Sequence, residues 1–515
     1  MRPRFAFVEG SKLALPVSGF AELERRAVSL GIVVDLKEFD CTGGPGFAAG
    51  RSEAGKLTEA HCTGLASVEF EAPIGPETPM NLGSVSKQFT VWAVALLEDA
   101  GELSFDDAAT RHLPVPEIGA TLLDLANHTN PFVDFPHWFY LRGADSAFAT
   151  RREVASATND GSLIAMNRSR GFLYSNTGYV MLAEVVRRVS GQKLAAFAAE
   201  HMFAPLGMAR TAFRDDVRAV MPGRAGVYDA EGTRAFDAGL TEETIGPGGL
   251  YSTLEDWAHW EANALENCLG NDPAAVSARL RGPEPIGEAG SRYYCGMRRT
   301  WLGQSMVEGH LGGFLGYTSF HQRVGDVAIL VMANGPRATA ADVGFRLVVD
   351  LTSEPIRDGY LPDVGIYRNR ETGILRRIVD GCVDGRAIMS LGPAAREGER
   401  GLLFYPTETG FREVCLGPSY DLEFEPIHPW TPENIDEYVG MYYSPRLANA
   451  CRIDVSGDEL VMEFNGEQRP MSPVSKDTFD AAARLSVCFR RDSGRVAGLE
   501  YGTNRIPVVD FARVS

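Results

Sequence analysis

The chain has 515 residues, a formal net charge of −18 and 44% hydrophobic residues. Such a length exceeds what one hydrophobic core supports, so we expect about two to four domains. The apolar content excludes a largely disordered chain, and the acidic balance argues against nucleic acid and anionic membrane surfaces as partners.

The N-terminal segment and the cysteines point to the cytoplasm. Residues 1–8 include basic residues, but their apolar run is short and is interrupted from Glu9 onwards, so neither a signal peptide nor a membrane helix is indicated. The eight cysteines are scattered singly, without the spacing of a zinc site. We therefore expect a cytoplasmic protein with reduced thiols, no metal, no cofactor and no membrane contact.

After a predicted strand at 31–35, an apolar run predicts a buried helix over 84–100. Ser84 and Lys87 stand three residues apart and so lie on one face of this helix. A buried ammonium is costly, and desolvation favours the neutral amine, which can take the proton of a nucleophilic serine. The helix N-terminus adds amide donors for an oxyanion formed at Ser84.

The spacing alone is weak evidence, because Ser190 and Lys193 repeat it at the end of a helix predicted over 177–190. A capping serine with a solvated lysine explains either copy equally well. Only the first copy is followed by an uninterrupted apolar helix, which favours Ser84 as the nucleophile.

A second motif, Tyr174-x-Asn176, immediately precedes the helix predicted over 177–190. Side chains two apart in an extended segment project the same way, so a phenol and an amide could face one site. The phenol could carry protons and the amide could hold a substrate amide. The alternative is a loop tyrosine followed by an asparagine N-cap. Between the first two motifs, aromatic residues at 132–140 could line the rim of a pocket or cover the core, and His128 could support the site or be structural.

The third motif is His310-x-Gly312-Gly313, which precedes a hairpin predicted from segments 315–321 and 327–334. Glycines here let a ligand lie against the backbone and leave amide groups within reach of an oxyanion. His310 could orient the substrate, or it could be a histidine in an ordinary turn. Other predicted helices span 192–203, 254–265 and 340–351.

Beyond about residue 357, short alternating runs separated by Gly, Asp and Pro are typical of small antiparallel β domains. Residues 363–367 are echoed at 438–442, which suggests two related β domains joined by a proline-rich connector. We expect a catalytic domain at 1–355 and β-barrel domains at 356–428 and 429–515.

The three motifs, in this order, resemble those of the penicillin-recognising serine hydrolases, which include class C β-lactamases, D-alanyl-D-alanine peptidases and related esterases. Flanking segments at 83–90, 203–208 and 248–253 also match. The resemblance covers about residues 60–350. It implies an α/β β-lactamase/transpeptidase-like domain, in which helices flank an antiparallel sheet and a helical subdomain lies between the first and third motifs.

The resemblance assigns a role to each matching residue. Ser84 would be acylated, Lys87 would activate it, and Tyr174 would shuttle the proton. Asn176 would bind the substrate amide, and the backbone N–H groups of Ser84 and Gly313 would form the oxyanion hole.

His310 and Gly312 stand where many relatives have Lys-Thr-Gly. In those relatives the lysine fixes the carboxylate of the substrate, so histidine argues against penicillin hydrolysis and carboxypeptidase action. His-x-Gly and two trailing β-barrels are most similar to the bacterial D-aminopeptidase branch. There, an aspartate in a long loop of the last barrel meets the substrate amine. Here the matching loop at 479–484 is short, and Asp480 is the candidate.

We therefore expect a serine hydrolase with a Ser84 acyl-enzyme that acts on small D-residue-containing peptides or amides. An esterase or acyltransferase using the same residues stays open, with ester or thioester substrates or amide-forming acyl transfer. A catalytically idle binding protein is a further alternative, and a homodimer is an open option.

Overall fold

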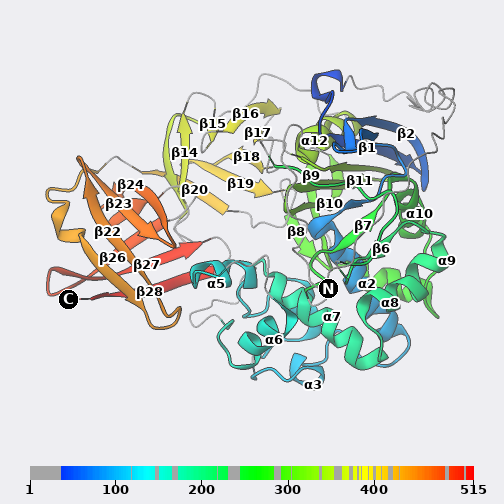
Figure 1. Ribbon diagram of the computed structural model, residues 1–515, viewed down its shortest axis with the longest axis horizontal. Coiled ribbons are helices and arrows are strands. Elements are labelled where there is room, and N and C mark those ends of the chain that lie inside the picture. The colour runs from blue at the N-terminus through cyan, green and yellow to red at the C-terminus, as the bar shows by residue number, and fades with distance from the viewer. Residues whose placement is uncertain are drawn as a thin grey trace, which may run out of the picture.

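A seven-stranded sheet covered by helices is followed along the chain by two β-barrels (Figure 1). The expected fold class, a β-lactamase/transpeptidase-like domain with two small β domains, is confirmed. The strand predicted at 31–35 lies outside the described residues. The computed structural model describes residues 36–514 except 118, 145–149, 165–171, 217, 230–243, 284–290, 303, 336–338, 353–361, 370–374, 380–381, 384–385, 392–393, 398–401, 408, 416–421, 428–429, 482–485 and 504–505.

The sheet is antiparallel in every pairing described for it. Its strand order is β2 (Lys56–Thr63), β1 (Phe47–Glu53), β12 (Val327–Ala333), β11 (Tyr317–Val324), β10 (Ser305–Phe314), β9 (Met297–Leu302) and β8 (Ser291–Tyr294). The predicted hairpin is formed by β11 and β12, which turn at residues 325–326.

Helices cover both faces of this sheet, which explains why strand β12 is apolar without alternation. In β1, Phe47 and Ala49 pack into one hydrophobic cluster with helix α12 (Ala340–Leu351), whereas Ala48 packs into the other with α2 (Lys87–Asp99) and α10 (Leu254–Leu265). Successive side chains of a strand point to opposite faces, so both sets must be apolar when both faces are buried.

The helices predicted at 84–100, 177–190, 254–265 and 340–351 are all present. The first begins as a 3-10 turn, η4 (Gly83–Ser86), and becomes α-helical at α2; the second is α7 (Asn176–Ser190). The helix predicted at 192–203 is divided into α8 (Leu194–Ala198), the π-helical η6 (Ala199–Phe203) and α9 (Ala204–Leu206). The remaining helices of this part are η3 (Lys37–Phe39) and α11 (Pro273–Arg281).

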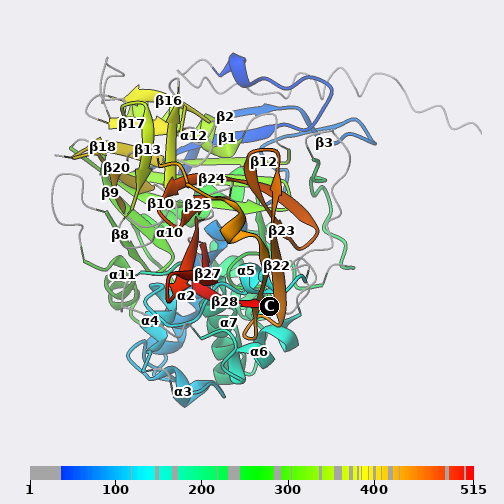
Figure 2. The same ribbon diagram turned by 90° about the vertical axis from the view of Figure 1, so that its left-hand side faces the viewer.

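A helical subdomain lies between the first and second motifs, at the lower end of the molecule in Figure 2. It consists of α3 (Ala109–His112), α4 (Leu122–Ala126), α5 (Phe135–Leu141) and α6 (Arg151–Asn159). The aromatic segment at 132–140 lies partly on α5; Phe132, which precedes the helix, and Phe135 and Trp138, which belong to it, are buried. These three rings belong to the core and not to a pocket rim.

Small sheets complete the first part of the chain. They pair β3 (Leu65–Ser67) with β4 (Ala72–Pro73), and β7 (Leu250–Ser252) with both β5 (Met80–Asn81) and β6 (Ala212–Phe213). Because β5 ends just before Ser84, its pairing with β7 fixes the backbone that enters the first motif.

Each barrel is an up-and-down closed sheet of eight strands, in which neighbours in sequence pair and the first strand meets the last. The first contains β13 (Gly365–Arg368), β14 (Leu375–Val379), β15 (Cys382–Val383), β16 (Arg386–Leu391), β17 (Ala394–Glu397), β18 (Leu402–Pro406), β19 (Phe411–Cys415) and β20 (Leu422–Ile427). After η7 (Asp436–Tyr438), the second contains β21 (Gly440–Ser444), β22 (Asn449–Ser456), β23 (Glu459–Phe464), β24 (Glu467–Ser475), β25 (Thr478–Asp480), β26 (Ser486–Asp492), β27 (Arg495–Thr503) and β28 (Ile506–Val514).

The sequence echo marks the first strand of each barrel. Tyr367 in β13 donates a hydrogen bond to the carbonyl of Asp363 at 3.0 Å, and Tyr442 in β21 donates to the carbonyl of Tyr438 at 2.7 Å. Each phenol therefore donates to the backbone carbonyl of the residue four positions earlier in the chain, and both rings are buried. The repeated pattern encodes the same packing in both barrels.

Among the residues with described structure, no helix is both long and apolar enough to cross a membrane. Within the same ranges, no group of three or more His, Cys, Asp or Glu residues is arranged to hold a metal ion.

A buried ion cluster attaches α10 to the sheet. Glu261, with 2% of its side chain exposed, lies 2.7 Å from Arg323 Nε and 2.8 Å from His321 Nε2, both on β11. Burial alone would raise the pKa of this carboxyl, but the neighbouring Arg323 and His321 outweigh it and lower the pKa to about 2.

Replacing Glu261 with glutamine should destabilise the protein by about 3 kcal/mol at pH 7, because the arginine loses a buried partner. The carboxylate stabilises the fold above its unfolded pKa of about 4.3, and this contribution is lost as pH falls towards about 2. Urea unfolding between pH 7 and pH 3, followed by circular dichroism, measures both effects. The matched control is E255Q, which replaces an exposed glutamate on the same helix. Equal midpoints for E261Q and wild type would contradict the expectation.

Candidate active site

The first motif sits where a tight turn enters a buried helix. Ser84 lies in the 3-10 turn η4, and Lys87 is the first residue of α2. Side-chain bonds hold the turn: Asn81 Oδ1 accepts from the Gly83 N–H at 2.7 Å, and Ser86 Oγ donates to the Gly83 carbonyl at 2.6 Å. The nucleophile candidate is therefore presented by a rigid backbone.

Lys87 is fully buried, with 0% exposure, and its ammonium donates to three oxygens. They are Ser84 Oγ at 3.1 Å, Asn176 Oδ1 at 2.8 Å and the Pro247 carbonyl at 2.8 Å. These acceptors match the three protons of an ammonium. The first two motifs are thus joined directly through the lysine.

Aromatic rings complete the surroundings of the lysine. Its nitrogen lies 4.8 Å from the centroid of the Tyr174 ring and 5.2 Å from that of Tyr179, distances at which a ring face attracts a cation. Burial raises the pKa of Tyr179 well above its usual value, and likewise that of Tyr293. Both phenols therefore remain neutral at any physiological pH.

Tyr174 reaches the nucleophile directly. Its hydroxyl donates to Ser84 Oγ at 2.9 Å, and its ring packs against His128 with centroids 4.3 Å apart. His128 also accepts a hydrogen bond from the backbone N–H of Ser175 at 3.1 Å through Nδ1. His128 therefore contacts both Tyr174 and the backbone of Ser175, which corresponds to the supporting role considered from the sequence.

Asn176 does not act as an N-cap, because it is the first residue of α7 and the cap position belongs to Ser175. Its side-chain oxygen instead accepts from Lys87, while its backbone N–H donates to Asp134 Oδ1 at 2.8 Å. The buried carboxylate of Asp134 thereby fixes the start of α7.

The third motif brings its backbone against the first. Pairing between β9 and β10 ends at Gly309, and β10 continues past η4. Gly83 has a φ of +48°, and a Cβ there would lie 2.6 Å from the nitrogen of Gly313; a Cβ on Gly312 would lie 2.1 Å from the Leu82 carbonyl oxygen. Only glycines allow this close approach, which places the peptide entering Ser84 beside that of Gly313.

His310 is buried and both ring nitrogens meet protein atoms. Nδ1 contacts the carbonyl of Leu311, which requires Nδ1 to donate, and Nε2 lies 3.3 Å from the hydroxyl of Tyr293. The ring centroid is 6.2 Å from that of Tyr174. The hydroxyl of Tyr293 can donate to an unprotonated Nε2, so both ring nitrogens are engaged by protein groups.

Asp480 has a different setting. It ends β25 of the second barrel, and its carboxylate lies 3.8 Å from Nη2 of Arg377 in the first barrel. The loop residues 482–485 that follow lie outside the described residues. The hydrogen bonds described for the serine, lysine and tyrosine do not involve Asp480, so the structure does not group it with the three motifs.

Three contributors were missed or undervalued from the sequence. Pro247 lies just before the flanking segment 248–253, and its carbonyl accepts a hydrogen bond from Lys87. Asp134 and Tyr293 have no local signal, because their roles depend on α5 and β8 packing beside the motifs. The second Ser-x-x-Lys copy is structural: Ser190 ends α7, Gly191 caps it with φ +75°, and Lys193 pairs with Asp215 at 3.7 Å.

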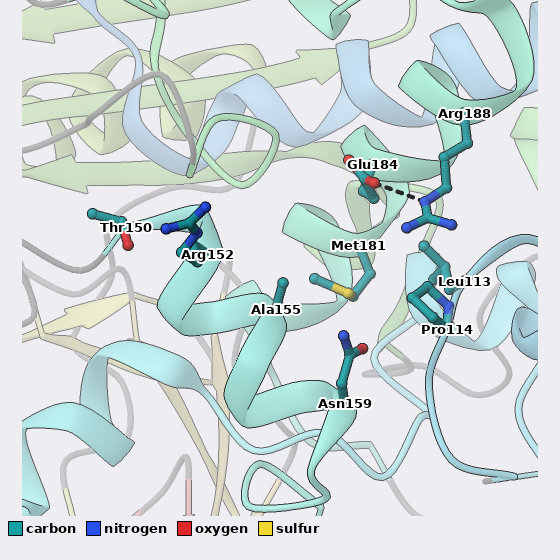
Figure 3. Close-up of a pocket in the computed structure, with 9 residues that line it drawn as sticks. All are labelled: Leu113, Pro114, Thr150, Arg152, Ala155, Asn159, Met181, Glu184 and Arg188. Carbon is teal, nitrogen blue, oxygen red and sulfur yellow. Dashed lines mark hydrogen bonds and ion pairs between the residues drawn. The ribbon is translucent and has the colours of Figure 1, made fainter.

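A separate cavity of about 510 Å³ lies in the helical subdomain (Figure 3). Its wall is formed by α6, α7 and the segment after α3, and Glu184 is paired with Arg188 across one side. None of the three motifs lines it. Its residues are Leu113, Pro114, Thr150, Arg152, Ala155, Asn159, Met181, Glu184 and Arg188.

Comparison with known proteins agrees with this geometry. A sequence profile of the family described as Beta-lactamase matches residues 35–352. D-aminopeptidase from Cereibacter sphaeroides is 24% identical over 511 residues, which cover 92% of this chain and 96% of that protein. Penicillin-binding protein 4* from Bacillus subtilis is 33% identical over 162 residues, or 31% of this chain and 36% of that protein. The crystal structure of SurE, 20% identical, covers 96% of this chain and 100% of its own with a TM-score of 0.56, which supports the fold.

Replacing Gly83 with alanine should slow acylation of Ser84 roughly a hundredfold, because the new methyl group would displace Gly313 from the oxyanion position. The rate of labelling by a fluorophosphonate, followed by mass spectrometry, measures this. G101A is a matched control: Gly101 also has positive φ, at +77°, but a Cβ there meets open space. Equal slowing in both variants would mean that backbone strain, and not the close approach, is responsible.

Replacing Lys87 with methionine should lower the same labelling rate at least about a hundredfold at pH 7, because Ser84 loses its proton acceptor. Methionine keeps the length of the side chain in a buried site. K193M removes the lysine of the second copy and should label at the wild-type rate. Unchanged labelling of K87M would remove the lysine from the mechanism.

Proposed function

The chain belongs to the Beta-lactamase family of serine hydrolases, and from this premise we propose that it is a D-aminopeptidase or amidase acting through a Ser84 acyl-enzyme. The observation that carries the proposal is the direct bonding of Ser84 Oγ to both Lys87 and Tyr174, at 3.1 Å and 2.9 Å. A nucleophile in contact with two proton-transferring groups is what acyl transfer requires.

Acylation begins with Lys87 as the neutral amine. The Ser84 proton passes to Nζ as Oγ attacks the carbonyl carbon of the substrate, and the oxyanion is bound by the N–H groups of Ser84 and Gly313. The C–N bond then breaks, and the leaving nitrogen takes a proton from the Tyr174 hydroxyl, which Lys87 replenishes. In deacylation, a water molecule gives a proton to the same pair as its oxygen attacks the acyl carbon. The ester bond between that carbon and Ser84 Oγ then breaks, and Oγ takes the proton back.

Two observations support an amide substrate that is cleaved at its amino-terminal side. Asn176 holds Lys87 through Oδ1, which leaves its Nδ2 protons to donate to a substrate carbonyl. His310 stands where many relatives carry a lysine, and both of its ring nitrogens already contact protein groups, so a substrate with a free carboxylate gains little there. The full-length match to D-aminopeptidase favours D-residues at the amino terminus.

An esterase or acyltransferase is the second candidate, and the position of Asp480 favours it. An aminopeptidase of the resembling branch places a carboxylate against the substrate amine. The candidate for that carboxylate, Asp480, is instead paired with Arg377. An ester substrate needs no such partner, and an incoming amine or alcohol could replace water in deacylation. A catalytically idle binding protein is disfavoured. Burying a lysine against the serine has a desolvation cost, which a protein without catalysis would have no reason to bear.

Substrate panels should separate these functions. We expect wild-type protein to be labelled at Ser84 by a fluorophosphonate and to hydrolyse D-alanine p-nitroanilide at least about tenfold faster than its L-enantiomer, a difference of about 1.4 kcal/mol in transition-state binding. Short-chain p-nitrophenyl esters are measured beside them, with S84A as the inactive control.

Each outcome assigns the function differently. Ester hydrolysis without a preference for D-amides would replace the aminopeptidase proposal by the esterase. Product formation only when an amine acceptor is added would indicate acyl transfer. If wild type and S84A are equally unlabelled and inactive, neither enzymatic function holds.

A further inference from the structure

The second barrel contacts helix α5 (Figure 1), and the residue before α5, Asp134, is hydrogen-bonded to Asn176 of the second motif. We propose that Arg446, Asn449 and Asn465 of this barrel are positioning residues that hold Tyr174 and Asn176 in place through α5. The inference rests on the proposed function only in requiring that Ser84 is acylated.

The barrel caps the C-terminal end of α5. Asn449 Nδ2 donates to the Leu141 carbonyl at 2.7 Å, and Asn465 Nδ2 donates to the carbonyl of Tyr140. Asn449 also bonds to Asn465 Oδ1 at 2.8 Å, so the two amides act as a unit. The N–H groups of Gly143 and Ala144 already bond to the carbonyls of Tyr140 and Phe139 at 2.9 Å, so the barrel adds a second bond at Tyr140 and binds the carbonyl of Leu141. Seven residues are too few for an independently stable helix, so these contacts from another domain help to hold the end of α5.

Arg446 fixes the same helix from its side. Its guanidinium lies 5.1 Å from the centroid of the buried Trp138 ring on α5 and donates to the Ile164 carbonyl at 2.6 Å. The planar group can stack and donate at the same time, which a lysine could not do in this geometry. The barrel therefore holds both the end and one face of α5.

The N-terminal end of α5 is bonded to the second motif. Thr177 Oγ1 donates to the Val133 carbonyl at 2.7 Å and accepts from the Phe135 N–H at 3.0 Å. Asp134 accepts from the Asn176 N–H at 2.8 Å. These bonds attach α5 to Asn176 and to its neighbour Thr177, and Asn176 is the residue that accepts from Lys87. A shift of α5 along its axis would therefore move Asn176 relative to the lysine.

The intervening helix is short enough to transmit such a shift. Seven residues at 1.5 Å each extend only about 10 Å, and the inner face of α5 is packed in the hydrophobic core. The barrel thus affects the site by holding a helix.

The test removes both amides while sparing the barrel. N449A is combined with N465G, since Asn465 has a φ of +54° that glycine adopts without strain. We expect the rate constant for fluorophosphonate labelling of Ser84 to fall about tenfold in protein that circular dichroism shows to be folded. Deuterium exchange should accelerate in peptides covering 133–142 and 172–178, while strands β11 and β12 exchange as in wild type.

D458A is the matched control, because Asp458 lies exposed in the neighbouring β22–β23 turn of the same barrel. A double variant that labels at the wild-type rate with unchanged exchange at 172–178 would overturn the inference, even though Ser84 chemistry stands. A wild type that is not labelled would instead refute the proposed function, and the exchange experiment would still decide whether the barrel orders the second motif. If the double variant does not fold, N465G alone is measured by the same criteria.

Discussion

The structure depends on the burial of one ammonium group. Lys87 has no access to solvent, so its protons must be accepted by protein oxygens, and these come from Ser84, Asn176 and Pro247. An unsatisfied buried charge would cost several kcal/mol, which makes the mutual placement of these three segments a condition for folding. The same contacts place Nζ beside Ser84 Oγ, where in the proposed mechanism it accepts a proton once the ammonium has become the neutral amine. Stability and chemistry are therefore coupled at this residue.

The oxyanion position depends on a second constraint, the contact of two backbones. Gly83 and Gly312 allow β10 to approach η4 more closely than any side chain would permit. The described β9–β10 pairing stops at Gly309, just before this point, while the pairing of β10 with β11 continues to Phe314.

The sequence predicted the elements with strong periodicity and the residues with distinctive chemistry. The buried helix after Ser84, the helix after Tyr174 and the two barrels follow from local apolar patterns, and the structure contains all of them. Local patterns could not separate core from rim for the aromatic residues of α5, because an apolar side chain looks the same in either place. They also could not identify Asp134, whose role appears only when α5 lies beside α7.

The amino-acid sequence by itself indicated the family and its serine hydrolase class, because Ser-x-x-Lys, Tyr-x-Asn and His-x-Gly occur in the order that resembles the penicillin-recognising enzymes. Only the tertiary structure decided which Ser-x-x-Lys copy is buried, that Asn176 binds Lys87 and does not cap a helix, and that the second barrel meets α5 while Asp480 meets Arg377. The physical reason is the range of the forces involved. Helix and strand preferences are set by neighbours along the chain, whereas desolvation of an ammonium and capping of a helix by another domain depend on segments far apart in sequence.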